Sequence, residues 1–110
     1  MMEKNGPSGR DALHVGVVGC GYWGPNLVRN LTENLHCGQI SVCDLDPTKL
    51  DRIRRRYPRI RAFTEYGKML AQTDLNAVMV ATPVSTHYPL AGEALRAGKH
   101  TFVEKPFTAS

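Results

Sequence analysis

The amino-acid sequence predicts an α/β fold, a single domain built on a doubly wound parallel sheet. Two observations lead to this prediction. Short, almost wholly apolar runs alternate with segments whose apolar residues recur at helical spacing, and a glycine-rich loop follows the first run. The chain of 110 residues is long enough for one hydrophobic core and too short for two ordinary domains.

Strands and helices are expected in strict alternation, after a flexible polar leader over residues 1–12. The strands are expected over residues 13–18, 39–44, 60–64, 75–83 and 100–106. The helices are expected over residues 25–35, 46–57, 65–72 and 87–99. Because βαβ units are right-handed, we expect one parallel sheet with its functional residues at the carboxyl ends of the strands.

Local signals predict where individual helices begin and end, and which of their residues face the core. Asp46 is expected to cap the second helix, and Gly98 is expected to end the last one. In that last helix, Leu90, Ala94 and Leu95 are expected to face the core.

The net charge of +4 has a local origin. Residues 49–61 hold seven basic residues and one acidic residue. Leu50, Ile53, Tyr57 and Ile60 recur in this segment at helical spacing, so we expect its arginines on the opposite, solvent-facing side. A phosphate or nucleic-acid patch is the alternative, and we expect no nucleic-acid partner.

Composition also argues against membrane and metal sites. No apolar stretch approaches the roughly 20 residues that a membrane helix needs, so no membrane partner is expected. The three cysteines form no CxxC pair, and His14, His36 and His100 have no ligand partners at suitable spacing, so no metal site is predicted. Free thiols and the lack of a signal peptide predict a cytoplasmic protein.

The stretch GCGYWG places Gly19, Gly21 and Gly24 between the first strand and the first helix. Gly19 permits a tight turn, Gly21 lets the backbone approach a pyrophosphate, and Gly24 lets the helix pack closely on the sheet. The backbone amides of Tyr22 and Trp23 fall in the same loop, although the two residues can equally be packing aromatics. The stretch predicts a Rossmann-type dinucleotide-binding loop, with a purely steric turn as the alternative.

Asp44 is the last residue of the expected second strand, twenty residues after Gly24. A carboxylate at this position accepts hydrogen bonds from an adenosine ribose and repels a 2′-phosphate. Asp44 therefore favours NAD over NADP as the cofactor, although Lys49 and Arg52 lie near enough to reach toward a phosphate.

Three stretches carry a resemblance to a known family. They are GVVGCGYWGPNLVRNL at residues 16–31, VCDLDPTKL at residues 42–50, and VATPVSTHYPLAGEALRAGKHTFVEKP at residues 80–106. In this order they resemble the amino-terminal domain of the Gfo/Idh/MocA oxidoreductases, the relatives of glucose–fructose oxidoreductase and inositol dehydrogenase. The resemblance covers about residues 13–108, and the GCGYWGPN form is most similar to members acting on nucleotide-linked or amino sugars.

The resemblance implies roles for particular residues. Thr82 and Pro83 match the motif that lines the nicotinamide end of the cofactor, and His87 matches a histidine near the nicotinamide ribose. Glu104 and Lys105 match a Glu-Lys-Pro motif, in which the glutamate lies with the cofactor-binding residues. The lysine of that motif contacts the substrate and assists proton transfer, so Lys105 is the expected catalytic residue. A cis peptide bond often follows this lysine in the family.

Members of the family continue past this motif into a second α/β domain that holds the substrate, whereas this chain stops at Ser110. We therefore expect the NAD-binding half of a sugar or polyol dehydrogenase, inactive alone and self-associating through its fifth strand. Its sugar-type substrate would bind only with the second domain. Two alternatives are a non-catalytic dinucleotide-binding module, such as a redox sensor or partner-activated subunit, and a domain that binds S-adenosylmethionine.

Overall fold

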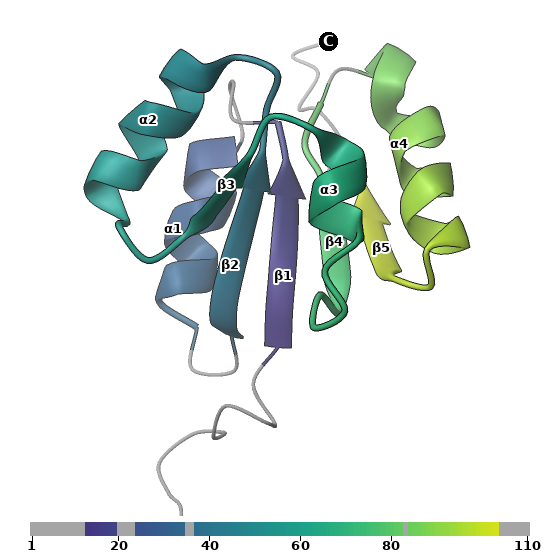
Figure 1. Ribbon diagram of the computed structural model, residues 1–110, viewed down its shortest axis with the longest axis horizontal. Coiled ribbons are helices and arrows are strands. Elements are labelled where there is room, and N and C mark those ends of the chain that lie inside the picture. The colour runs from purple at the N-terminus through teal and green to yellow at the C-terminus, as the bar shows by residue number, and fades with distance from the viewer. Residues whose placement is uncertain (1–12, 20–23, 35–36, 83, 104–110) are drawn as a thin grey trace, which may run out of the picture.

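The computed structural model describes residues 13–19, 24–34, 37–82 and 84–103. In these ranges strands and helices alternate along the chain, as the sequence predicts (Figure 1). The strands are β1 (Leu13–Val18), β2 (Cys37–Cys43), β3 (Arg61–Phe63), β4 (Ala77–Val80) and β5 (His100–Val103). The helices are α1 (Gly24–Thr32), α2 (Pro47–Arg56), α3 (Tyr66–Leu70) and α4 (Val84–Arg96).

The strands form one parallel sheet in the order β3-β2-β1-β4-β5. β1 lies at its centre, where Val17 pairs with Val42 of β2 and with Met79 of β4. Because all strands run in the same direction, their carboxyl ends meet at one edge, at the top of Figure 1. The order of the strands confirms the predicted doubly wound sheet.

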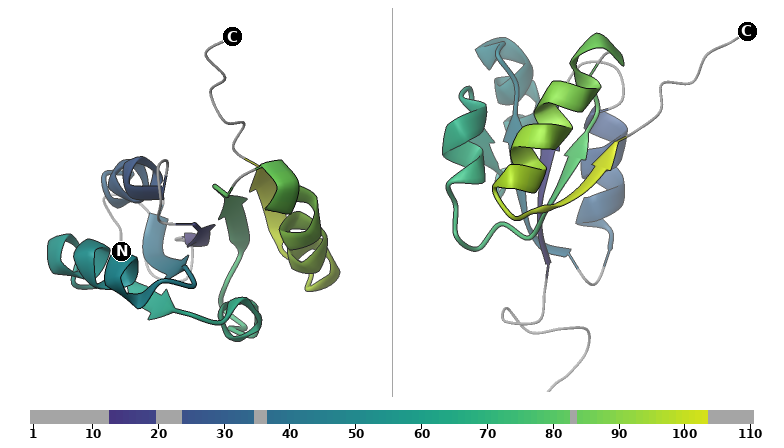
Figure 2. Two further views of the ribbon diagram at one scale, coloured as in Figure 1. Left: turned by 90° about the horizontal axis from the view of Figure 1, so that it is seen from above. Right: turned by 90° about the vertical axis from the view of Figure 1, so that its right-hand side faces the viewer.

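Helices cover both faces of the sheet, α1 and α2 on one side and α3 and α4 on the other (Figure 2). Each face has its own hydrophobic core. Val17 enters the first core with Val28 of α1 and Ile53 of α2, whereas Val18 enters the second with Met69 of α3 and Ala94 of α4. Consecutive residues of β1 thus point into opposite cores, as the two-residue period of a strand requires.

Two predicted helix ends are confirmed. The side chain of Asp46 accepts a hydrogen bond from the N–H of Thr48 at 2.9 Å, so Asp46 is the N-cap of α2. At the end of α4, Gly98 has a φ of +80°, which favours glycine. The N–H groups of Gly98 and Lys99 donate to the carbonyls of Leu95 and Ala94, the pattern of a Schellman cap.

Other expectations about α4 were wrong. Leu95 is 62% exposed rather than in the core, because Ala91 and Ala94 occupy the face of α4 that packs on the sheet. The helix also begins at Val84 rather than at residue 87, and so holds Pro89 in its interior. A proline there removes one helical hydrogen bond, which the packing of the helix over β4 and β5 outweighs. The leader over residues 1–12 lies outside the described residues.

Candidate functional site

A pocket of about 400 Å³ opens at the carboxyl-terminal edge of the sheet. The ends of β1, β2 and β4 form one side of it, and α3 and α4 supply the other. Three of the residues singled out in the sequence, Gly19, Asp44 and Thr82, line this pocket together although they are far apart along the chain.

Gly19 makes the turn out of β1. Its φ is +99°, a conformation that L side chains rarely adopt, and its N–H donates to the carbonyl of Cys43 at 2.8 Å. One residue earlier, the carbonyl of Val18 accepts a hydrogen bond from Ala81 at 2.9 Å. Gly19 therefore lies between the ends of β2 and β4, the place where a doubly wound sheet binds its ligand.

Asp44 is the first residue after β2, and its side chain is half-buried at the pocket. Its backbone N–H donates to Phe63 of β3, which fixes the residue at the strand end. Its Oδ1 accepts a hydrogen bond from the N–H of Asp46 at 2.8 Å, so the carboxylate is held in an Asx turn. Asp44 thus presents a positioned negative charge to the pocket.

The pocket also contains a buried polar atom without a partner. Thr82 Oγ1 has no hydrogen-bond partner among the described residues. A bound polar ligand commonly supplies the partner of such an atom. Close by, Leu45 is 89% exposed beside Asp44, an apolar surface on which a flat ring can pack. A carboxylate for a ribose, an unpaired hydroxyl and an apolar wall together fit an adenosine-bearing cofactor.

Sequence reasoning missed the wall that α3 and α4 contribute. The hydroxyl of Tyr66 donates to the carbonyl of Leu90 at 2.7 Å and so joins the two helices beside the pocket. Burial, followed by the charges of Glu93 and Cys43, raises the pKa of Tyr66 to about 12, so it stays a neutral donor. Tyr66 comes shortly after β3, and the rule that selected the other strand ends could have found it.

Cys43 lies in the same pocket, at the last position of β2. Burial, with a smaller effect of the Asp44 charge, raises the pKa of its thiol to about 11. Because the thiolate is the reactive form of cysteine, Cys43 is a packing residue rather than a nucleophile at neutral pH.

The remaining predicted residues have different placements. Gly24 is the first residue of α1, and His87 lies in the first turn of α4. β5 ends at Val103, which pairs with Val80 of β4, two residues before Thr82. Six predicted residues lie outside the described residues: Gly21, Tyr22, Trp23, Pro83, Glu104 and Lys105. The same holds for the peptide bond that follows Lys105.

At the opposite edge of the sheet, a buried polar network surrounds His14. Its Nε2 lies 2.7 Å from Ser41 Oγ, and its Nδ1 lies 3.3 Å from Asp74 Oδ1 without the geometry of a hydrogen bond. Gln72 donates to the same Ser41 hydroxyl at 3.0 Å. Ser41, His14 and Asp74 lie in the order of a Ser-His-Asp triad. Ser41 is fully buried, however, so no substrate can reach its hydroxyl. The network is structural.

Two further expectations concern metals and membranes. Within the described ranges, no group of three or more His, Cys, Asp or Glu side chains could hold a metal ion. No helix in that part of the chain is both long enough and apolar enough to cross a membrane.

Comparison with known proteins agrees with this arrangement. The sequence pattern of the Gfo/Idh/MocA group, described as an oxidoreductase family with an NAD-binding Rossmann fold, matches residues 13–110. The chain belongs to this family. The match confirms the resemblance seen in the sequence, and it is to an NAD-binding family rather than to one that binds S-adenosylmethionine.

Individual relatives extend well beyond this chain. Glycosyl hydrolase family 109 protein 2 of Shewanella sp. (strain ANA-3) is 30% identical over 91% of the chain but only 24% of its own length. GenD2 from gentamicin A biosynthesis, solved with NAD, has 31% identity and a TM-score of 0.82, covering 100% of this chain and 31% of GenD2. The WlbA dehydrogenase of Bordetella pertussis, solved with NADH and UDP-GlcNAcA, has 30% identity and a TM-score of 0.78, covering 86% of this chain and 30% of WlbA. This Gfo/Idh/MocA chain therefore spans about a quarter to a third of their lengths.

Proposed function

We propose that the pocket between Gly19, Asp44 and Thr82 holds the adenosine half of NAD. The observation that carries this proposal is the Asp44 carboxylate, held by its Asx turn at the end of β2 in a residue that lines the pocket. There it accepts hydrogen bonds from the ribose hydroxyls and repels a 2′-phosphate, so NAD binds in preference to NADP. The Gly21, Tyr22, Trp23 and Gly24 stretch supplies amides for the pyrophosphate.

We propose further that the complete enzyme oxidises or reduces a sugar-type hydroxyl. The bound nicotinamide supplies the hydride chemistry. Thr82, Pro83, His87 and Glu104 position its ribose end, and Lys105 moves the proton of the substrate hydroxyl. A nucleotide-linked amino sugar is the substrate class we favour, since the WlbA structure contains UDP-GlcNAcA. The substrate binds only with a further substrate-binding domain.

The cofactor proposal is tested by titrating the 110-residue chain with NADH and NADPH in parallel calorimetric experiments at one salt concentration. The variants are Asp44→Asn and Asp51→Asn. Both remove one negative charge, but Asp51 is exposed on α2 and does not line the pocket. Asn can keep the Asx turn, so any change reports the charge rather than a rearranged loop.

We expect the parent chain to bind NADH more tightly than NADPH, and Asp44→Asn to narrow the ratio of the two dissociation constants by about tenfold. Asp51→Asn should leave that ratio unchanged. Equal affinities of the parent chain for both cofactors would contradict the role of Asp44 and implicate Lys49 and Arg52 instead.

Self-association and location complete the proposal. β5 pairs with β4 on one side, and its other edge is unpaired among the described strands. Phe102 and Val103 are 57% and 39% exposed on this strand, a surface that favours association. A reducing compartment such as the cytoplasm would keep Cys37 and Cys43 as the free thiols that the structure contains.

A further inference from the structure

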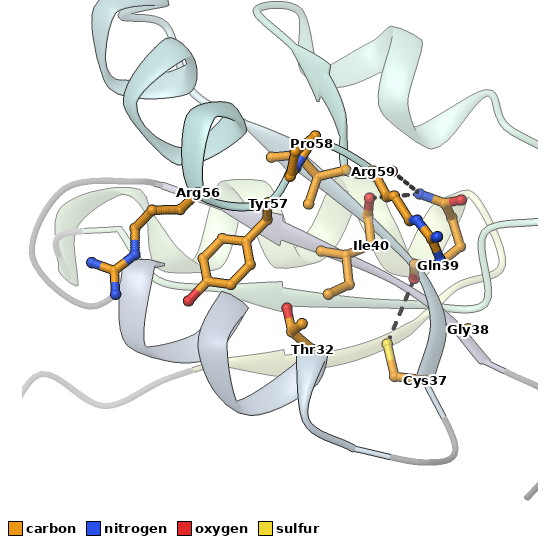
Figure 3. Close-up of a pocket in the computed structure, with 10 residues that line it drawn as sticks. Thr32, Cys37, Gly38, Gln39, Ile40, Arg56, Tyr57, Pro58 and Arg59 are labelled. Carbon is orange, nitrogen blue, oxygen red and sulfur yellow. Dashed lines mark hydrogen bonds between the residues drawn. The ribbon is translucent and has the colours of Figure 1, made fainter.

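A second hollow lies on the other face of the sheet, between α1 and α2. Its larger part has a volume of about 510 Å³ and lies among the end of α1, the start of β2 and the segment after α2 (Figure 3). A smaller part of about 230 Å³ continues between the two helices. Arg56 and Tyr57 line both parts, so they form one site, which we call the α1–α2 groove.

Three arginines surround the smaller part of the α1–α2 groove. Arg29 comes from α1, while Arg52 and Arg56 come from successive turns of α2. Arg52 and Arg56 are exposed, as the sequence predicts for the arginines of α2, and they also line this hollow beside α1. Like charges at such spacing repel each other.

Among the described residues, no carboxylate relieves this repulsion, because none of those that line either part of the groove is Asp or Glu. Across the described residues, no ion pair involves Arg29, Arg52 or Arg56. An oxyanion would offset the repulsion, and the fork of N–H groups on each guanidinium matches phosphate, sulfate or carboxylate oxygens.

The larger part of the groove is mainly apolar. Figure 3 shows Tyr57 extending from the end of α2 toward α1, with Arg56 beside it. Ile40 and Ile60 are buried beneath this space. The Gln39 side chain donates to the carbonyls of Ile40 and Arg59 at 3.0 and 3.1 Å, which holds the far wall in place. The combined hollow falls in the size range of small-molecule sites, roughly 300–1,000 Å³.

We propose that the α1–α2 groove binds a small organic anion, with its oxyanion on the three arginines and a flat apolar body against Tyr57. The groove lies over the first core, on the face of α1 and α2, whereas α3 and α4 supply the wall of the dinucleotide pocket. The two sites share no lining residue, so both can be filled at once.

The competing explanation is that arginines near the end of α2 only stabilise the helix dipole. Arg55 provides the matched control for this explanation. Like Arg56, it is exposed and lies in the last turn of α2, but it lines neither part of the groove. A helix-dipole role predicts the same behaviour for both residues, whereas a ligand site predicts that Arg56 alone matters.

The test is a titration of the ¹⁵N-labelled chain with 2-naphthyl phosphate, followed by amide chemical shifts in the presence of saturating NADH. Parallel titrations use 2-naphthol, inorganic phosphate and the variants Arg52→Gln, Arg56→Gln and Arg55→Gln. We expect shifts at Gln39, Ile53 and Tyr57, and affinity about tenfold lower in the Arg52 and Arg56 variants but unchanged in Arg55→Gln.

Both 2-naphthol and inorganic phosphate should bind more weakly than 2-naphthyl phosphate, because each makes only part of its contacts. The proposal is overturned if 2-naphthyl phosphate does not bind, or if its shifts fall at Gly19, Asp44 and Thr82 instead. It is equally overturned if Arg55→Gln weakens binding as much as Arg56→Gln. If inorganic phosphate bound as tightly as 2-naphthyl phosphate, the apolar part of the proposed ligand would be contradicted.

Discussion

Gly19 packs directly against Ala81, since a Cβ built on Gly19 would lie 2.8 Å from the Ala81 carbonyl oxygen. This contact brings the end of β1 against the end of β4. It leaves space for a backbone but for no side chain. The glycine is therefore required by the close approach of the ends of β1 and β4 as well as by its φ of +99°.

Gly19→Ala should lower the free energy of unfolding by at least about 1–2 kcal/mol, the cost of placing an L residue in a left-handed backbone conformation. The contact of the new Cβ with the Ala81 carbonyl oxygen adds to this cost. Urea unfolding followed by circular dichroism measures this change. Gly67→Ala is the control, because a Cβ on Gly67 meets nothing within 4 Å and Gly67 lies in α3. That variant should be neutral or slightly stabilising, and an equal loss in both variants would contradict the explanation.

His14 should make the stability depend on pH. Burial lowers its pKa below 6.5, with Arg61 acting in the same direction and Asp74 opposing both. As the pH falls through 6.5, the unfolded chain binds a proton at this residue more readily than the folded chain does, so the free energy of unfolding decreases. Urea unfolding at several pH values between about 7.5 and 5 should show this decrease.

The matched pair for this prediction is His14→Gln and His100→Gln. His100 is exposed at the start of β5, so its loss should leave the pH dependence as in the parent chain. His14→Gln should flatten it, whatever the variant does to stability at neutral pH. A parent-like slope in His14→Gln would show that another group is responsible.

Self-association should depend on the edge strand. Phe102→Lys places a charge on the exposed part of β5, which opposes edge-to-edge pairing. We expect the parent chain to form dimers or larger species at high micromolar concentration in sedimentation velocity, and the variant to shift toward the monomer. Leu45→Lys, at an exposed leucine away from β5, is the control. A monomeric parent chain would refute the prediction.

Most of the fold follows from local signals in the sequence. The apolar runs mark all the strands. Asp46 begins α2 and Gly98 follows the end of α4 where expected, because each acts through local geometry. Leu95 shows the limit of periodicity. Leu95 and Ala91 are both apolar, and only the packing against the sheet decides which of them is buried.

The candidate site was partly predictable for a similar reason. Asp44 and Thr82 stand at strand ends, and topology alone brings such residues to one edge. Tyr66 was missed although it comes shortly after β3, where the strand-end rule applies. Its contact with Leu90, which joins α3 to α4 beside the pocket, is recorded by no sequence pattern. That Arg52 and Arg56 line a hollow with Arg29 of α1 likewise depends on how two helices lie side by side.

The central place of β1 has a consequence for how the molecule opens. β1 is hydrogen-bonded along both of its edges, and its side chains enter both cores. Its amide hydrogens can exchange with deuterium only when the whole sheet separates, whereas β3 and β5 can fray alone at the margins. The slowest exchange rates, at residues such as Val17, therefore report the global unfolding free energy. A ligand on either face would slow them through mass action, even where it touches no atom of β1.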